Sequence, residues 1–155
     1  MRKIFCFSMF LLSFARILVA QSVNLVIEVN EKIVIGEIGR MYLIFGSGVD
    51  EKKISADYVP GKLTLSQDTW KIINSDTSIK FSLHFDYTTY KKNIQQIANF
   101  YVDLSQKKLN QSYLILNIYD FRDRKYKNWY KSYTDKEFLA ELRFPNSGMY
   151  IRVIK

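Results

Sequence analysis

The chain has 155 residues, of which 48% are hydrophobic and 15% aromatic, so it can bury a domain-sized core and is not typical of a disordered protein. Its formal net charge is +8, from 23 basic and 15 acidic residues. The single cysteine, Cys6, lies in the N-terminal apolar segment, which excludes disulfides, thiol nucleophiles and cysteine metal sites from the rest of the chain.

Residues 1–20 are typical of a secretory signal peptide. The basic start, Met1-Arg2-Lys3, is followed by an uncharged apolar run from Ile4 to Ala15. This run has twelve residues, well short of the roughly 20 that a membrane span needs. Cleavage after Ala20 is preferred, and cleavage after Ala15 stays open. We expect a secreted or periplasmic protein whose mature chain has no transmembrane span.

Alternation of apolar and polar residues dominates the chain from Val23 onward and predicts short β-strands. We expect these strands at residues 23–29, 33–35, 41–45, 54–58, 79–87, 98–104, 113–121, 138–144 and 149–154. The cleanest case is 79–87, which places large apolar side chains on one face and polar side chains on the other. The segment 113–121 is apolar on both faces, which predicts a central strand.

One short helix is expected near residues 67–73, with Ser66 as its N-cap and with Trp70 and Ile73 at i, i+3 spacing. Short strands separated by turns, with almost no helix, predict an all-β fold. We expect a single antiparallel β-sandwich of about eight strands, immunoglobulin-like in architecture, that occupies residues 21–155 as one domain.

Two runs near the C-terminus carry a family resemblance, QSYLILNIYDFRDRKYKNWY (111–130) and DKEFLAELRFPNSGMYIR (135–152). They resemble small, uncharacterised secreted proteins of flavobacterial type, most clearly over the last third of the chain. The resemblance implies a signal peptide and a β-sandwich. It provides no catalytic residue that can be transferred to this chain.

His84 is the only histidine, so a catalytic or metal-binding interpretation has to start there. Strand alternation places it on a polar face with Ser82 and Asp86. On one strand these three side chains project in parallel, whereas a Ser–His–Asp triad needs them to converge. We expect an exposed histidine without a catalytic role. A hydrolase that uses His84 with Asp86 is kept as a third alternative.

Asp120 and Asp123 flank the end of the predicted central strand. We expect one of them to pair with a neighbouring arginine and to order the turn, because Arg122 and Arg124 would repel a bound cation. No P-loop, GxSxG, HExxH or dinucleotide-binding motif is present in the sequence. The sequence therefore predicts no enzyme, no cofactor and no metal site.

The segment RDRKYKNWYKSY, residues 122–133, concentrates positive charge and aromatic rings. Tyr, Trp and Arg are the side chains that most often anchor interfaces, and rings beside cations suit stacking on a ligand. The residues predicted to bind a partner are Arg122, Arg124, Lys125, Lys127, Trp129 and Tyr130. Secretion argues against nucleic acid and favours an envelope protein or an anionic polysaccharide.

The same segment has a purely structural interpretation, as an extended connection whose rings fold over the end of the domain. In an extended chain Trp129 and Tyr130 point to opposite faces, so only one of them can meet a ligand. We predict a non-catalytic secreted or periplasmic binding or accessory module. The alternative is a carbohydrate-binding module that stacks sugars on Trp129 and a tyrosine.

Overall fold

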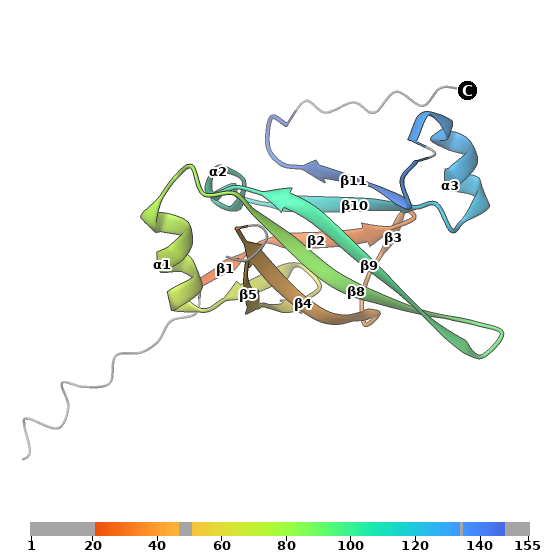
Figure 1. Cartoon of the computed structure of the whole chain (residues 1–155), viewed down its shortest axis with the longest axis horizontal. Helices are drawn as coiled ribbons and strands as arrows, with labels where there is room; N and C mark the ends of the chain where they lie inside the picture. Colours follow the sequence, from red (N-terminus) through yellow and green to blue (C-terminus); the bar gives the residue numbers. More distant parts are fainter. Residues whose placement is uncertain (1–20, 47–50, 134, 148–155) are drawn as a thin grey trace, which may run out of the picture.

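The computed structural model describes residues 21–46, 51–133 and 135–147 (Figure 1). The predicted signal peptide, with Cys6, and the predicted last strand at 149–154 lie outside the described residues. Within them the chain is mostly β, with 52% of the residues in strands and 18% in helices, arranged as three sheets and a few helices.

One four-stranded sheet, here called the hairpin sheet, is antiparallel and has the strand order β5-β4-β8-β9. Its strands are β4 (Ile38–Phe45), β5 (Lys52–Ser55), β8 (Phe81–Lys91) and β9 (Ile94–Leu104). The turn between β8 and β9 places Lys92 and Asn93 at φ values of 51° and 62°, as a two-residue hairpin turn requires. The hairpin extends past β4, which pairs with β8 only as far as Tyr87, and its tip projects from the body (Figure 1).

The second four-stranded sheet, the mixed sheet, has the strand order β11-β10-β2-β3. Its strands are β2 (Leu25–Val29), β3 (Lys32–Ile33), β10 (Leu114–Asp120) and β11 (Phe138–Arg143). The prediction of a wholly antiparallel fold is wrong here, because β2 and β10 pair in parallel. Parallel neighbours need a long crossover, which the intervening hairpin sheet supplies, and residue alternation carries no information on strand direction. The central position predicted for β10 is confirmed.

A three-stranded sheet, in the order β1-β7-β6, completes the strands. It consists of β1 (Gln21–Val23), β6 (Asp57–Val59) and β7 (Lys62–Leu65). Eleven strands within the described residues exceed the eight expected, partly because the predicted strand at 54–58 breaks at Ala56 and continues in another sheet.

The predicted helix is confirmed as α1 (Gln67–Ser75), where Ser66 Oγ accepts a hydrogen bond from the backbone N of Thr69 at 3.1 Å. Trp70 and Ile73 are buried on its inner face. The expectation of a single helix is wrong. The further helices are α2 (Gln106–Leu109), α3 (Arg124–Trp129) and the 3₁₀ helix η2 (Lys131–Tyr133).

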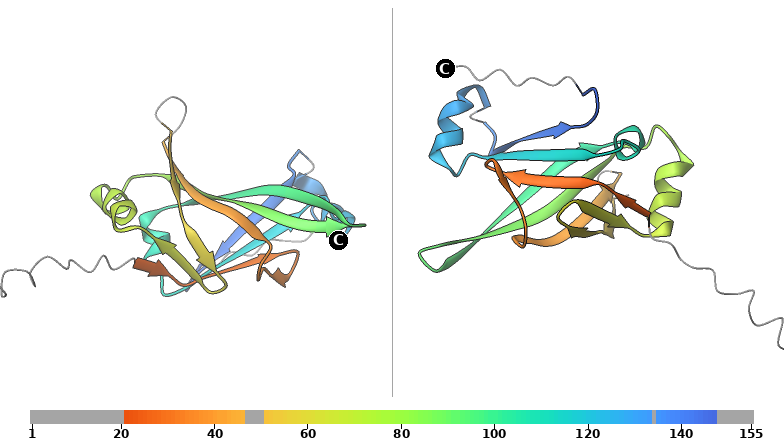
Figure 2. Two further views of the ribbon diagram at one scale, coloured as in Figure 1. Left: turned by 90° about the horizontal axis from the view of Figure 1, so that it is seen from below. Right: turned by 180° about the vertical axis from the view of Figure 1, so that it is seen from behind.

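One hydrophobic core joins the sheets and α1. The mixed sheet contributes Ile27 and Leu116 and the hairpin sheet contributes Leu43 and Phe85, all with no exposed surface. Figure 2 shows the strands of the two four-stranded sheets running at an angle to one another. A second, aromatic cluster lies on the outer face of the mixed sheet, beneath α3.

Candidate functional site

α3 and η2 cover most of the segment 122–133, so its interpretation as an extended connection is wrong. Asp123 caps α3, its carboxylate accepting a hydrogen bond from the backbone N of Lys125 at 2.9 Å. Tyr126 and Tyr130, one helical turn apart, both face inward. Trp129 keeps 40% of its surface exposed whereas Tyr130 keeps 6%, so Trp129 is the residue of that adjacent pair that faces solvent.

Aromatic contacts hold α3 against the end of β10. The ring of Tyr119 lies 4.9 Å from that of Tyr130 and 5.8 Å from that of Tyr126, measured between centroids, and Phe121 stacks on Tyr130 at 6.1 Å. Burial raises the pKa of the Tyr119 and Tyr130 phenols, so both stay neutral at physiological pH. The helix therefore rests on a packed, uncharged base.

The start of this region is fixed by an ion pair between Asp120 and Arg122, with Nη2 and Oδ2 only 2.6 Å apart. The backbone N of Asp120 also donates a hydrogen bond to Asn30 Oδ1 at 2.8 Å. The prediction that Asp120 or Asp123 pairs with an arginine and orders the turn is confirmed for Asp120. Because that carboxylate neutralises Arg122, this guanidinium is poorly placed to attract an anionic partner.

Lys125 is engaged as well. Its Nζ lies 2.9 Å from Glu31 Oε2, 4.4 Å from the ring centroid of Trp129 and 4.7 Å from that of Tyr126. Hydrogen bonds from Lys125 and from the Tyr126 hydroxyl lower the pKa of Glu31. Lys125 thus links α3 to the turn after β2 and covers part of the indole of Trp129.

Three cations of the segment remain exposed. Arg124, Lys127 and Lys131 form no side-chain hydrogen bond or ion pair with any described residue. Arg124 and Lys127 are three residues apart on α3, on the side away from the inward Tyr126, and Lys131 opens the 3₁₀ helix η2 that follows. We call Arg124, Lys127, Trp129 and Lys131 the α3 surface. Of the six predicted residues, it retains Arg124, Lys127 and Trp129.

Two grooves lie along β9, and the sequence reasoning missed both; Lys127 of the α3 surface lines the smaller of them. The larger, the Asp103 groove, has a volume of about 540 Å³ and is lined by Tyr101, Val102, Asp103, Lys108, Asp135, Lys136, Glu137, Phe138, Leu139, Ala140 and Leu142. The smaller, the Tyr130 groove, has about 470 Å³ and is lined by Ile97, Ala98, Asn99, Phe100, Asp120, Phe121, Arg122, Lys127, Tyr130, Lys136, Glu137 and Phe138.

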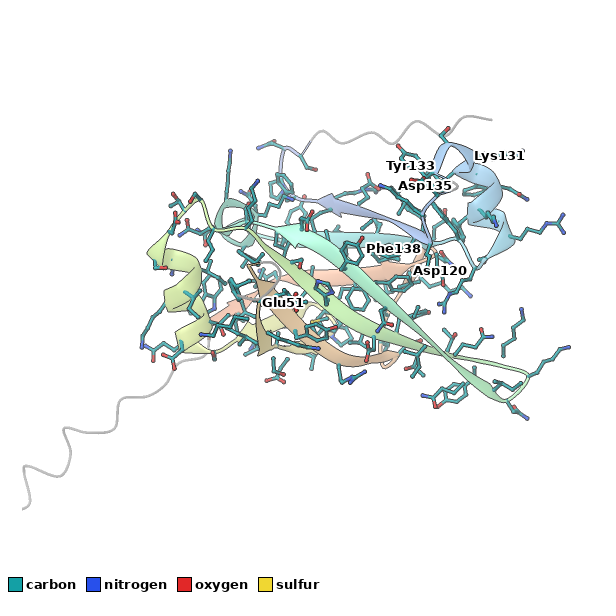
Figure 3. The ribbon with its side chains drawn as sticks, viewed as in Figure 1. Glu51, Asp120, Lys131, Tyr133, Asp135 and Phe138 are labelled. Carbon is teal, nitrogen blue, oxygen red and sulfur yellow. The ribbon has the colours of Figure 1, made fainter. Side chains whose placement is uncertain are left out.

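Phe138 lines both grooves. Its ring meets those of Phe100 and Tyr101 edge to face, with centroids 5.1 and 5.2 Å apart. Figure 3 shows Phe138 and Asp120 near the α3 end of the mixed sheet. Residue alternation places Phe138 on a strand but carries no signal that this strand begins beside β9, which is why the grooves escaped prediction.

The expectation of an exposed His84 is wrong, because its ring is partly buried between Tyr42 and Tyr101 on neighbouring strands. The ring centroids are 5.4 and 5.3 Å apart and the rings are nearly parallel. Lys53 Nζ lies 3.4 Å from the ring centroid of Tyr42, and Phe138 meets Tyr101 at the other end of the row. Tyr42 and Tyr101 cover the two faces of the His84 ring, so His84 is not an open platform for sugar stacking, although Tyr101 itself stays 52% exposed.

Asp86 is buried, although alternation predicts it on a solvated face. Its carboxylate accepts hydrogen bonds from Arg40 Nε, at 2.7 Å, and from the amide of Asn99. His84 Nε2 instead forms its hydrogen bond with Ser82 Oγ, at 2.8 Å. The His–Asp bond that orients a triad histidine is absent among these described residues.

Across residues 21–46, 51–133 and 135–147, no three or more His, Cys, Asp or Glu side chains converge as metal ligands would. None of the helices in those ranges combines the length and the apolar character needed to cross a bilayer. Comparison of the chain with protein-family models, curated proteins and solved structures finds no match.

Proposed function

We propose that this chain is a non-catalytic binding module, secreted or periplasmic, that holds an acidic protein partner on the α3 surface. The observation that carries the proposal is the set of three exposed cations, Arg124, Lys127 and Lys131, on the same helical segment that exposes Trp129. The basic and apolar start of the chain supports export. An immunoglobulin-like sandwich is our proposal for the architecture that presents this surface.

Because α3 is held in place, its exposed cations are already positioned to bind an acidic partner. Tyr126 and Tyr130 bury the inner side of α3, and the ion pair of Asp120 with Arg122 fixes its approach. Because the backbone is already ordered, an acidic partner meets charges that need little rearrangement. Complementary charge also accelerates encounter, and a partly desolvated tryptophan supplies an anchor.

The aromatic geometry favours a protein over a sugar. Trp129 meets Tyr126 edge to face, with centroids 5.5 Å apart, and Lys125 lies over its ring. Among the described residues, the indole therefore has no coplanar ring beside it with which to form a two-ring platform for a polysaccharide. A carbohydrate-binding module is retained as the alternative that the experiment must separate.

The test uses the mature full-length chain and measures tryptophan fluorescence during titration with poly-L-glutamate, polygalacturonate at matched carboxylate concentration, and cellohexaose. Trp70 is buried, so the exposed Trp129 dominates any change that a bound polymer causes. The variant R124Q/K127Q/K131Q removes the cations of the α3 surface. The control K62Q/K80Q/K107Q removes the same charge from exposed lysines elsewhere.

We expect saturable poly-L-glutamate binding that weakens as salt increases, that falls about tenfold in the α3 triple variant and that persists in the control. Equal losses in both triple variants would reduce the effect to net charge and overturn the proposal. Tighter binding of polygalacturonate, or salt-resistant binding of cellohexaose, would replace the protein partner with a carbohydrate.

A further inference from the structure

No described strand is hydrogen-bonded to the outer edge of β9, although β11 begins close to it, where Phe138 packs its ring against Phe100 and Tyr101. β9 is the last strand of the hairpin sheet, and its eleven residues pair with β8 without a register shift from Leu104 to Ile94. In an antiparallel edge strand, alternate backbone N–H and C=O groups point away from the sheet. Within the described residues no second strand pairs with them, so this edge can hydrogen-bond an added strand.

This edge also lacks the features by which proteins usually block unwanted pairing. It contains no proline, lysine or arginine, and Asp103 is its single charged residue. The other edges of the two large sheets are short or charged. β5 has four residues, two of them lysines, β3 has two residues, and β11 carries Glu141 and Arg143. A long unguarded edge in a soluble fold is expected where a partner strand binds.

Side chains beside the edge are suited to an extended segment. On the outer face of β9, Ile97 and Tyr101 are 54% and 52% exposed, so an added strand would find apolar surface there. The Tyr130 groove follows β9 over 97–100 and the Asp103 groove over 101–103. An added strand would place alternate side chains over Ile97 and Tyr101, and the grooves leave room beside them.

The charges around the Asp103 groove indicate which side chains a bound segment would carry. The Asp103 groove carries Asp103, Asp135 and Glu137, none of them in an ion pair with a described residue. Of its two lysines, Lys108 already donates from Nζ to the carbonyl of Asp103 at 2.9 Å, and Lys136 lies 5.8 Å from the ring centroid of Tyr133. This end of the edge therefore favours a basic side chain on the incoming segment.

We infer that the β9 edge binds an extended segment of a partner polypeptide as a fifth strand of the hairpin sheet. The segment alternates apolar residues, which cover Ile97 and Tyr101, and it carries Lys or Arg where it passes Asp103. This recognition uses backbone hydrogen bonds for affinity and alternate side chains for specificity. It differs from the α3 surface, which takes a partner of the opposite charge, although Lys127 belongs to that surface and also lines the Tyr130 groove.

The experiment selects binders from a phage-displayed library of random peptides of about twelve residues on the mature full-length chain. Affinities of the selected peptides are then measured for the chain and for three variants. I97K/Y101K places lysines on the exposed face of β9, V59K adds a lysine at a similarly exposed apolar residue of β6, and D103N/D135N/E137Q removes the groove carboxylates.

We expect the selected peptides to alternate apolar residues and to contain Lys or Arg. Binding should fall about tenfold in I97K/Y101K, stay unchanged in V59K, and lose its preference for basic residues in D103N/D135N/E137Q. Two N-methylated versions of a peptide are compared, one methylated at the odd-numbered backbone amides and one at the even-numbered amides. One version should lose binding and the other should keep it, since only alternate amides of an added strand face β9.

Absence of enrichment, equal binding to I97K/Y101K, or equal binding of both methylated versions would overturn the inference. Sedimentation of the full-length chain tests whether a second copy of the chain occupies the β9 edge. A dimer that I97K/Y101K dissociates would assign the edge to self-association and also overturn it. The variant R124Q/K131Q, which leaves Lys127 of the Tyr130 groove in place, should bind the peptides normally, so failure of one proposal does not imply failure of the other.

Discussion

Asp120 and Arg122 form a two-point ion pair across a single intervening residue. Arg122 Nε contacts the two carboxylate oxygens at 2.9 and 3.0 Å, and Nη2 contacts Oδ2 at 2.6 Å. The carboxylate also accepts a hydrogen bond from the backbone N of Arg122 at 2.9 Å. One buried side chain thus fixes both the backbone and the side chain at the point where β10 ends and α3 approaches.

The first prediction concerns this ion pair. Replacement of Asp120 by Asn should lower the free energy of unfolding by about 1–2 kcal/mol, a modest loss because the Arg122 side chain is 42% exposed and partly screened by water. Urea denaturation of D120N, R122Q and the double variant measures the coupling. If the losses of unfolding free energy in D120N and R122Q simply add up in the double variant, the ion pair between Asp120 and Arg122 is contradicted.

The second prediction separates the two adjacent aromatic residues of α3. Tyr130→Ala should destabilise the fold by about 3 kcal/mol, because it removes a buried ring from the cluster beneath α3. Trp129→Ala should cost less than about 1 kcal/mol and should instead weaken poly-L-glutamate binding. Y130F, which keeps the ring, serves as the control if Y130A fails to fold. If W129A lost more unfolding free energy than Y130A, the assignment of Trp129 to the surface and of Tyr130 to the interior would be wrong.

Residue alternation was sufficient to predict most strands and the central position of β10, because burial on one or both faces leaves a direct mark on the order of residues. It was insufficient for α3. There, Asp123 followed by inward Tyr126 and Tyr130 at i, i+4 is a helix signal, and the density of lysines around it concealed that signal. An N-cap read together with two aromatic residues would have found it.

The surroundings of His84 and Asp86 were beyond sequence reasoning for a different reason. His84 is enclosed by Tyr42 and Tyr101 because the register aligns these three residues across β4, β8 and β9. Asp86 is buried because Arg40 and Asn99 lie close enough to bond its carboxylate. Both outcomes depend on which strands are neighbours, and no single strand contains that information.

The third prediction concerns Glu37, whose Oε2 accepts hydrogen bonds from the backbone N of Gly36 and of Ile35, each at 2.9 Å. These bonds lower the pKa of Glu37 from its ordinary value of 4.5. A carboxyl whose pKa is depressed on folding adds stability above its unfolded pKa and loses it as the pH falls through the folded value. E37A should therefore be less stable than the wild type at pH 7.

The same variant provides the pH control. The difference in unfolding free energy between the wild type and E37A should narrow steadily as the pH falls below about 4.5, because both chains then lack the charged carboxylate. Denaturant titrations from neutral to acid pH measure it. A difference that stays constant over this range would show that Glu37 acts through packing and not through its charge.

The last prediction concerns His84, whose ring protons are unambiguous in NMR spectra because the chain has one histidine. Burial between Tyr42 and Tyr101 lowers its pKa below the ordinary 6.5, Glu51 raises it, and Lys53 lowers it. An NMR titration should give a midpoint below 6.5. K53A should raise that midpoint, and E51Q should lower it further.

The shift in the pKa of His84 also predicts how stability depends on pH. The folded chain binds this proton more weakly than the unfolded chain, so His84 lowers the free energy of unfolding as the pH falls from above 6.5 through the folded pKa. H84F keeps an aromatic ring between Tyr42 and Tyr101 and does not titrate, so its stability should lack this decline. A midpoint at or above 6.5, or an unchanged decline in H84F, would mean that the ring is not desolvated and that another group controls stability in this pH range.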